Sequence, residues 1–334
     1  MPKSSPKDAS KKRPKFFIID GHAHIYRAYF APFRDLTSPT GEPTKATYVF
    51  TQMLFQIAEQ QQPDYLCMVI DHGDETVFRR EIDPNYKANR EPPPDDFKPQ
   101  EERIIQLVKD AGIPIYVAPG FEADDLIASI VDQNKGEYDF HLVSKDKDLR
   151  QLLGDGVVIY DPQKDETFDA DAMHAKLGYT PEQATEVQAL MGDNIDNVPG
   201  VPGIGEKTAA KLINKYGSAL AVFEHADELT PKQSERVKEH GSGQIETSMK
   251  LVTLLRDVKV DGFDLDACKF EGLEAPTLQN HLEELGFRTL LHKAGGTPAK
   301  NAPPQKRVKP KYNPLPPMGG LFDPPADEQP ETTD

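Results

Sequence analysis

Short apolar runs without alternating polar residues constrain the fold of this chain most strongly. They occupy residues 16–20, 64–71, 113–118, 140–144 and 157–160. Runs of this kind are typical of parallel strands that are covered by helices on both faces. Amphipathic stretches at 44–61, 98–111 and 122–132 separate them. The pattern therefore predicts an α/β domain over residues 16–180, with a doubly wound and mainly parallel sheet.

The strand pattern ends near residue 180, and short helices are predicted at 181–191, 206–216, 230–239 and 244–255. Pro181 at a first helical position and Gly217 just past a helix end are ordinary start and stop signals. We therefore expect a small helical domain at 181–293. Residues 1–15 read as a disordered basic arm, for which a solvated tail without function is the simpler interpretation. Residues 294–334 read as a disordered Pro-rich tail.

Composition limits the functional classes. No run approaches 18 apolar residues, so no membrane partner is expected, and the basic N-terminus lacks the apolar core of a signal peptide. Only Cys67 and Cys268 occur, which predicts neither a disulfide framework nor a zinc site. A cytoplasmic monomer is the simplest expectation.

The net charge of −16 at first argues against a nucleic-acid partner, because polyphosphate affinity comes largely from Lys and Arg. The charge is segregated, however. Residues 1–15 carry six basic groups and one acid, and a second basic group comprises Arg79, Arg80, Lys87 and Arg90. The acidic total therefore leaves DNA binding open.

A spaced series of acids is the main chemical signal, and its first seven members lie at or just beyond predicted strand ends. Strand ends are where an open α/β sheet builds its site. Hard oxygen ligands suit Mg²⁺ or Mn²⁺, whereas zinc would call for His and Cys at short spacings. The sequence thus predicts a two-metal site formed by Asp20, Asp71, Glu122, Asp124, Asp125, Asp146, Asp148, Asp193 and Asp196.

Each acidic group also has an ordinary structural interpretation. Glu122, Asp124 and Asp125 fall in a first helical turn, where acids cap free N–H groups and offset the macrodipole. Three acids in four residues exceed what capping requires. Asp193 and Asp196 would be neighbours on one helix face if the backbone there is helical. Four such groups at consistent positions favour metal binding.

The run GVPGIGEKTAAKL, which begins at Gly200, is no Walker A loop. Glu206 separates Gly205 from Lys207, and no strand precedes the run. A helix-hairpin-helix turn fits better, because its glycines let main-chain N–H groups approach a phosphate at the next helix N-terminus. The predicted DNA-binding residues here are Gly203, Gly205, Lys207, Thr208 and Lys211.

Several motifs together resemble the 5′ nuclease (flap endonuclease) superfamily, and most closely the 5′-3′ exonuclease domain of bacterial DNA polymerase I. They are IIDGHAHIYRAYF, FRRE with YKANR, GFEADDLIA, SKDKDLRQLL, ALMGDNIDNVPGVPGIGEKTAAKLI and the weaker HLEELGFRTLL. The resemblance covers about residues 16–293. One departure is that His22, Ala23 and His24 stand where the family commonly has a serine pair. These histidines either join the outer shell of the metal or only bond locally.

The resemblance implies a PIN-like 5′ nuclease core in which none of the nine family metal acids is missing. The first ion is then assigned to Asp20, Asp71, Glu122, Asp124 and Asp125, with Asp146 partly shared. The second is assigned to Asp148, Asp193 and Asp196. Residues 78–98 resemble the helical arch, whose basic positions Arg79, Lys87 and Arg90 contact the scissile phosphate and threaded strand. Tyr86 is either a stacking partner for a base or a surface tyrosine. A K⁺ ion at the helix-hairpin-helix turn is also expected.

The predicted activity is hydrolysis of 5′ flaps, nicked or gapped duplexes and RNA primer junctions by a two-metal mechanism in replication and repair. A bacterial, nucleoid-associated location follows. The alternatives are a non-catalytic, structure-specific DNA-binding protein and a phosphatase of small substrates. Polymerase activity is not predicted, although a separate polymerase is an expected partner. Leu321 and Phe322 in MGGLFDPP weakly resemble motifs that dock on sliding clamps.

Overall fold

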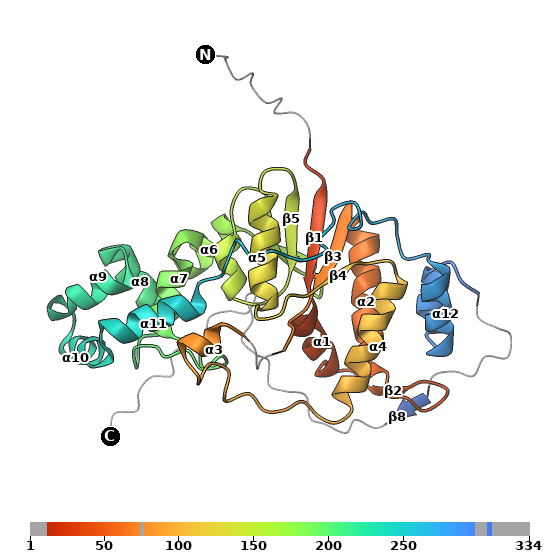
Figure 1. The fold of residues 1–334 in the computed structure, drawn as a ribbon, viewed down its shortest axis with the longest axis horizontal. Coiled ribbons are helices and arrows are strands. Elements are labelled where there is room, and N and C mark those ends of the chain that lie inside the picture. Colours follow the sequence, from red (N-terminus) through yellow and green to blue (C-terminus); the bar gives the residue numbers. More distant parts are fainter. Residues whose placement is uncertain (1–11, 74–76, 298–305, 309–334) are drawn as a thin grey trace, which may run out of the picture.

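A six-stranded sheet forms the centre of the computed structural model, which describes residues 12–73, 77–297 and 306–308 (Figure 1). The strand order is β4-β3-β1-β5-β6-β7, and all pairs are parallel except β6 with β7. The strands are β1 (Lys15–Asp20), β3 (Tyr65–Val69), β4 (Ile115–Tyr116), β5 (Asp139–Val143), β6 (Val157–Asp161) and β7 (Glu166–Phe168). The predicted α/β class is confirmed. The antiparallel edge strand β7 was not predicted.

One face of the sheet presents Phe17, Ile19, Leu66 and Met68, all fully or almost fully buried. Helices on this face contribute to the same core: α1 (Gly21–Tyr29), α2 (Lys45–Gln56), α4 (Phe97–Asp110), α12 (Pro276–Glu284) and α13 (Arg288–Lys293). A short π-helical turn at Ile57–Gln61 extends α2. Side chains alternate between the two faces of a strand, so neighbouring apolar residues of β1 serve two different cores.

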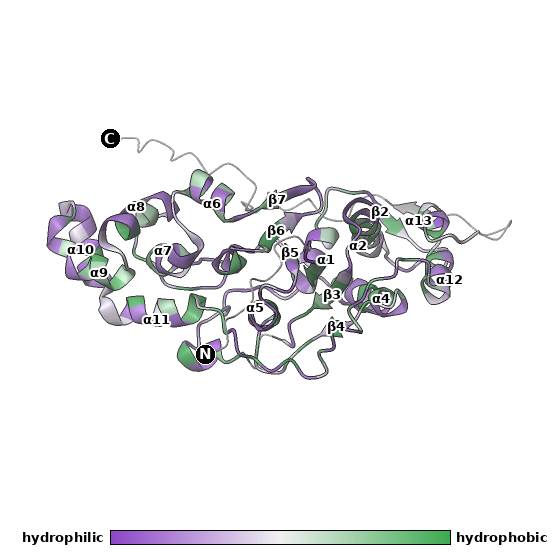
Figure 2. Ribbon diagram, turned by 90° about the horizontal axis from the view of Figure 1, so that it is seen from above, coloured by the Kyte–Doolittle hydropathy of each residue, from purple (hydrophilic) through white to green (hydrophobic). Residues whose placement is uncertain are grey.

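The opposite face presents Phe16, Ile18, Cys67 and Val69, which pack with α5 (Ala123–Gln133). The same core continues into the helical part of the chain through Val187, which is fully buried. Helices in Figure 2 carry both hydrophilic and hydrophobic colours, as amphipathic helices do. Both faces of the sheet are therefore covered, which explains its uninterrupted apolar strands.

The helical part lies beside the sheet in Figure 1, and the four helices predicted between residues 181 and 255 are present with ends that differ by a few residues. The predicted helix 181–191 begins as a 3₁₀ turn at Pro181–Gln183. Gly217, at the end of α8, has a φ of 93°, a conformation that glycine adopts readily. The helices are α6 (Ala170–Leu177), α7 (Ala184–Met191), α8 (Glu206–Tyr216), α9 (Ala219–Glu224), α10 (Pro231–His240) and α11 (Ser242–Val252).

Three features differ from the sequence expectations. The segment from Cys268 to Lys293, predicted as part of the helical unit, packs on the sheet unit through the main-chain bond Leu66 N to Cys268 O and through α12 and α13. The predicted strand 113–118 is reduced to two residues in β4. In the predicted tail, β8 (Lys306–Val308) pairs antiparallel with β2 (Asp35–Thr37). Long-range contacts that local patterns do not encode decide the first and the third of these features.

The predicted arch begins with the short helix α3 (Arg79–Ile82). From α3 the chain runs along the lower edge of Figure 1 to α4, and so connects the helical part to the sheet part. Among the described residues, no helix is long and apolar enough to cross a membrane. The basic arm, apart from its last residues, and the docking motif around Leu321 lie outside the described residues.

Candidate active site

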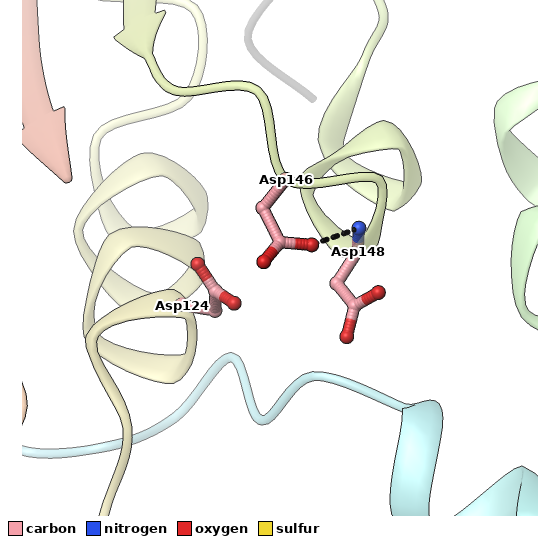
Figure 3. A group of neighbouring side chains, drawn as sticks. All are labelled: Asp124, Asp146 and Asp148. Carbon is pink, nitrogen blue, oxygen red and sulfur yellow. Dashed lines mark hydrogen bonds between the residues drawn. The ribbon is translucent and has the colours of Figure 1, made fainter. Parts of the chain in front are cut away.

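Three carboxylates meet at the C-terminal edge of the sheet (Figure 3). One oxygen from each of Asp124, Asp146 and Asp148 lies within 4.8 Å of the others, and all three side chains are half-buried. The main-chain N–H of Asp148 donates to Oδ1 of Asp146 at 2.9 Å, which fixes the turn between them. The structure therefore brings together acids from two segments more than 20 residues apart.

The strand order explains this meeting. Asp146 follows β5, Asp20 ends the adjacent β1, and Asp71 lies two residues beyond β3 on the other side of β1. Parallel neighbours end at one edge of the sheet, so their terminal residues converge there. The hydroxyl of Ser144 donates to Oδ2 of Asp20 at 2.8 Å, and Asp71 Oδ1 accepts the main-chain N–H of Ala123 at 2.8 Å.

These acids raise one another's pKa values. Burial, and next the charges of Asp71 and Asp146, raise the pKa of Asp20 to about 7. Burial and neighbouring carboxylates also raise the pKa values of Asp124 and Asp148 well above the usual range, and that of Asp146 to a smaller extent. A bound cation would reverse this effect, because opposite charge favours the ionised form.

The donor set fits a hard divalent cation. All three groups of the trio offer oxygen, which Mg²⁺ and Mn²⁺ prefer. Asp124, Asp146 and Asp148 form no ion pair with any residue in the described ranges. Crowded carboxylates without a protein counter-charge are destabilising unless a cation neutralises them. We therefore regard the trio as a candidate metal centre.

Glu122 and Asp125 lie on the other side of the same helix turn and are paired with cations of the protein. The Arg79 guanidinium donates to Oε2 of Glu122 at 2.7 Å and to both oxygens of Asp125 at 2.6 and 2.8 Å. Asp125 also accepts the main-chain N–H of Leu255 at 2.9 Å. Asp125 is fully buried and caps α5 together with Glu122. Its oxygens are therefore occupied by protein donors rather than turned to the trio.

Arg79 and Tyr86 differ from their predicted roles. Arg79 is only 2% exposed, and its remaining donors bond the carbonyls of Leu251 and Thr253 in and after α11. In this conformation it holds two parts of the chain together and contacts no open site. Tyr86 is 3% exposed, and its hydroxyl donates to Glu122 at 3.0 Å. Its ring therefore has no free face for stacking on a base.

Lys87 and Arg90 do reach the acidic site. The Lys87 ammonium is paired with Glu122 and lies 3.9 Å from Asp196 Oδ2, while Arg90 donates to Asp196 Oδ1 at 2.7 Å. Lys87 has a φ of 55°, and its main-chain N–H donates to the Asp196 carbonyl at 3.0 Å. The arch segment is therefore fastened across the loop that carries Asp196.

The helical arrangement expected for Asp193 and Asp196 was wrong. Gly192, with a φ of 71°, ends α7, and Asp193 and Val198 then exchange main-chain hydrogen bonds of 2.9 and 2.7 Å across a tight turn. Asp193 Oδ1 accepts the main-chain N–H of Ile195 at 2.8 Å, which competes with helix formation. Both acids still contribute to the raised pKa values of Asp146 and Asp148.

The sequence reasoning missed two neighbours of the acids, Glu101 and Gln188, whereas it expected His22 either to join the outer shell of the metal or to bond locally. His22 places Nδ1 3.1 Å from Asp71 and Nε2 2.9 Å from Glu101, so it links the site to α4. Burial lowers the pKa of His22, but its bonds to the two carboxylates outweigh this effect and raise the pKa to about 10. Gln188 donates to Asp148 at 2.5 Å. Glu101 and Gln188 carry no local signal, because they come from distant helices.

His24 lies apart from these contacts. It is buried, and burial followed by the charge of Arg27 lowers its pKa to about 3. The two histidines after Asp20 therefore have different surroundings. Only His22 contacts a predicted metal ligand.

The predicted phosphate-binding turn has the expected backbone. Gly203 has a φ of 76°, and Gly205 is the N-cap of α8 without any side-chain cap. Lys207 and Lys211 are exposed one helical turn apart, so they lie on one face. Thr208 is half-buried, and its main-chain N–H donates to the Gly205 carbonyl at 3.0 Å.

Comparison with known families decides the relationship. Residues 15–178 match the N-terminal, resolvase-like domain of 5′-3′ exonucleases, and residues 179–276 match the C-terminal SAM fold of the same proteins. The chain is 35% identical over 277 residues to the 5′-3′ exonuclease of Aquifex aeolicus, covering 82% of this chain and 93% of that protein. This chain belongs to the 5′-3′ exonuclease family. It is thus a metal-dependent phosphodiesterase by family, and the resemblance inferred from its motifs is confirmed.

This exonuclease also resembles part of longer proteins. It is 36% identical over 282 residues to the thermostable DNA polymerase I of Thermus thermophilus, covering 84% of this chain and 33% of that protein. With DNA polymerase I of Rhizobium leguminosarum it shares 35% identity over 292 residues, or 85% of this chain and 28% of the polymerase. The chain therefore spans about a third of these polymerases.

Solved structures share the fold at low sequence identity. T5 5′-exonuclease with bound zinc has a TM-score of 0.59 and 24% identity, and the match covers 84% of this chain and 99% of that one. Flap endonuclease-1 from Methanococcus jannaschii has a TM-score of 0.57 and 16% identity, over 85% and 91% of the two chains. These matches establish the 5′ nuclease fold with its C-terminal helical domain.

Proposed function

We propose that this exonuclease is also a structure-specific 5′-flap endonuclease that hydrolyses phosphodiesters of DNA and of RNA primers with two divalent ions. The observation that carries the proposal is the trio of Asp124, Asp146 and Asp148, which meets at the sheet edge and forms no ion pair with the described residues. Family membership supplies the reaction class. A solved relative, the T5 D15 flap endonuclease, is described in complex with DNA and metal ions.

We assign Mg²⁺ to the site, with Mn²⁺ as a substitute. Bound ions of this charge would activate a water molecule and stabilise the leaving oxygen. The trio, with Asp20 and Asp71, would hold them on the sheet side, and Asp193 and Asp196 would do so from the loop after α7. Glu122 and Asp125 remain assigned as ligands only if their pairs with Lys87 and Arg79 open. In the described conformation they orient the first turn of α5.

Lys87 and Arg90 are the cations placed to meet a substrate. Both contact Asp196 at the rim of the acidic site, and Arg90 is 39% exposed. If a phosphate entered between them, Lys87 and Arg90 could bind its oxygens in place of the Asp196 carboxylate with little movement of either side chain. Their charge would then stabilise the phosphate in the transition state. Arg79 supports this arrangement indirectly by fixing Glu122.

Duplex DNA would be held away from the acids by the turn at Gly203 and Gly205. Exposed N–H groups at the start of α8, together with Lys207 and Lys211, favour phosphate without reading sequence. A K⁺ ion at this turn is part of the proposal, and exchange of KCl for tetramethylammonium chloride would test it. The expected substrates are flaps, nicks, gaps and primer junctions. A polymerase acting in trans or a sliding clamp is the expected protein partner.

Cleavage of a labelled 5′-flap duplex tests the proposal. With Mg²⁺ the wild-type chain should cut the flap, and Asp146→Ala should lower the rate by a factor of at least about 100, the scale of losing one preorganised electrostatic contact. Asp132→Ala is the matched control, because Asp132 lies at the solvent side of α5, 47% exposed. Equal cutting by Asp146→Ala would contradict the assignment.

Two further arms separate the alternatives. A non-catalytic DNA-binding protein would bind the flap in EDTA, and it would not cut the flap whichever metal is added. A phosphatase of small substrates would hydrolyse p-nitrophenyl phosphate, and duplex DNA would not compete. Product lengths on flap and blunt substrates would give the balance between endonuclease and exonuclease cutting.

A further inference from the structure

A guanidinium lies directly against the helix-hairpin-helix turn, although no sequence motif points to it. A Cβ atom added to Gly203 would lie 1.9 Å from Nη1 of Arg236. The Arg236 side chain therefore occupies the space that any larger residue at 203 would fill. Arg236 comes from α10, more than 30 residues further along the chain and outside the motif itself.

The backbone at Arg236 is held in place by the next residue. Val237 is fully buried in the core of the helical part, so α10 is anchored beside Arg236. Arg236 itself is partly exposed, and Pro202, Gly203 and Gly205 beside it are exposed. The guanidinium thus lies at the surface of the turn rather than inside the core.

Its charge is also unneutralised. Within the described ranges, Arg236 forms no ion pair or hydrogen bond, whereas Lys238 on the same helix is paired with Asp227. A guanidinium presents five donors in a planar fork that matches phosphate oxygens. An unpaired arginine held against a glycine turn is suited to an anion that approaches the turn.

We propose that Arg236 is a further phosphate-binding residue for the backbone of duplex DNA, acting beside Gly203 and the start of α8. The inference rests on the proposed function, since it assigns an additional contact to the duplex-binding surface. Arg236 extends that surface from α8 to α10. It takes no part in phosphodiester hydrolysis.

Binding of a blunt duplex over a range of salt concentrations tests the proposal. In the Asp146→Ala background with Mg²⁺, fluorescence anisotropy gives the dissociation constant without cleavage. Adding Arg236→Gln should weaken binding about 3- to 10-fold and lower the slope of log K against log[salt] by about one, the signature of one lost phosphate contact. Arg236→Lys should restore most of the slope, because it keeps the charge. Lys238→Gln is the matched control and should change neither quantity.

Other outcomes overturn the proposal. An unchanged salt slope in Arg236→Gln means that no phosphate contact was lost, whether or not affinity falls. A fall in affinity that accompanies a lower melting temperature at constant slope means that Arg236 only packs on the turn. Both results are independent of flap cutting by the wild-type chain, so failure of this inference is distinguishable from failure of the nuclease proposal.

Discussion

Two neighbouring groups of carboxylates at one edge of the sheet have opposite surroundings. Asp124, Asp146 and Asp148 form no ion pair with the described residues, and their pKa values are raised. Glu122 and Asp125, in the same helical turn as Asp124, are paired with Arg79. Adjacent residues of one type thus belong to two different sites.

The difference arises because the acids in the first turn of α5 point in different directions. Residues 124 and 125 are separated by about 100° around a helix, so their side chains face different neighbours. Asp124 faces the edge of the sheet, and Asp125 faces the interface with α11 and the residues that follow it. The carboxylates of the trio repel one another, and a bound cation would relieve this repulsion. Glu122 and Asp125 are already neutralised by protein cations, and their ion pairs stabilise the fold.

Removal of Arg79 should have the largest effect on stability. Arg79→Ala leaves Asp125 buried without a counter-charge and removes one of the two cations paired with Glu122. Breaking such a buried pair costs about 3 to 5 kcal/mol. Urea denaturation in EDTA gives the free energy of unfolding. Lys259→Ala is the control, because its ion pair with Asp261 at 3.2 Å is exposed and should contribute less than about 1 kcal/mol. Equal losses in the two variants would remove the distinction between the two carboxylate groups.

Neutralising one acid from each group should change stability in opposite directions. Asp148→Asn should raise the unfolding free energy in EDTA by on the order of 1 kcal/mol, because it relieves like-charge repulsion at short range. Asp125→Asn should lower it, because Arg79 loses its bidentate partner. Thermal melts with and without Mg²⁺ provide the second measurement. The metal-induced rise in melting temperature should disappear in Asp148→Asn, and stabilisation of the metal-free protein by both variants would contradict the comparison.

Loss of His22 should weaken metal binding at the sheet edge and should leave the pairs of Glu122 and Asp125 with Arg79 unchanged. It holds Asp71 through a bond to Glu101, and loss of such outer support typically weakens metal affinity at least about tenfold. His22→Ala should therefore shift the Mg²⁺ concentration of half-maximal thermal stabilisation upward by about that factor. His72→Ala is the control, since His72 is an exposed histidine next to Asp71. An unchanged midpoint for His22→Ala would show that Asp71 needs no support.

The comparison requires all variants to be measured at one pH, because buried histidines such as His141 add a pH dependence of their own. Burial, and next the charge of Lys15, lower the pKa of His141 to about 4 from an ordinary value of 6.5. As pH falls below 6.5, His141 takes up a proton in the unfolded chain but stays neutral in the folded chain. The folded state therefore loses stability until the pH reaches about 4. The loss at pH 5.5 should be about 1 kcal/mol.

His141→Gln should make this dependence of the unfolding free energy on pH less steep, and the part that remains comes from other buried histidines such as His24. The exposed His174 provides the control variant His174→Gln. An equally steep curve for His141→Gln would place the titrating group elsewhere.

Much of the fold was predictable because its strands and helices follow from the local pattern of apolar and polar residues. The apolar runs that became β1, β3, β5 and β6 have no polar alternation, and the helices around them are amphipathic over at least two turns. The start of α8 follows from Gly205 and the residues after it. The pairing of β8 with β2 and the return of α12 to the sheet were not predictable, since their partners are more than 150 residues away.

The same division applies to the site. By itself the sequence determined that acids follow the strands, that a glycine turn precedes α8, and that the chain carries the motifs of 5′ nucleases. Tertiary structure alone decided which acids remain open, because Arg79 and Lys87 approach from a segment folded across α11. It also placed Arg236 against Gly203. The physical reason is that electrostatic partners are selected by distance in space, and only the packed chain sets those distances.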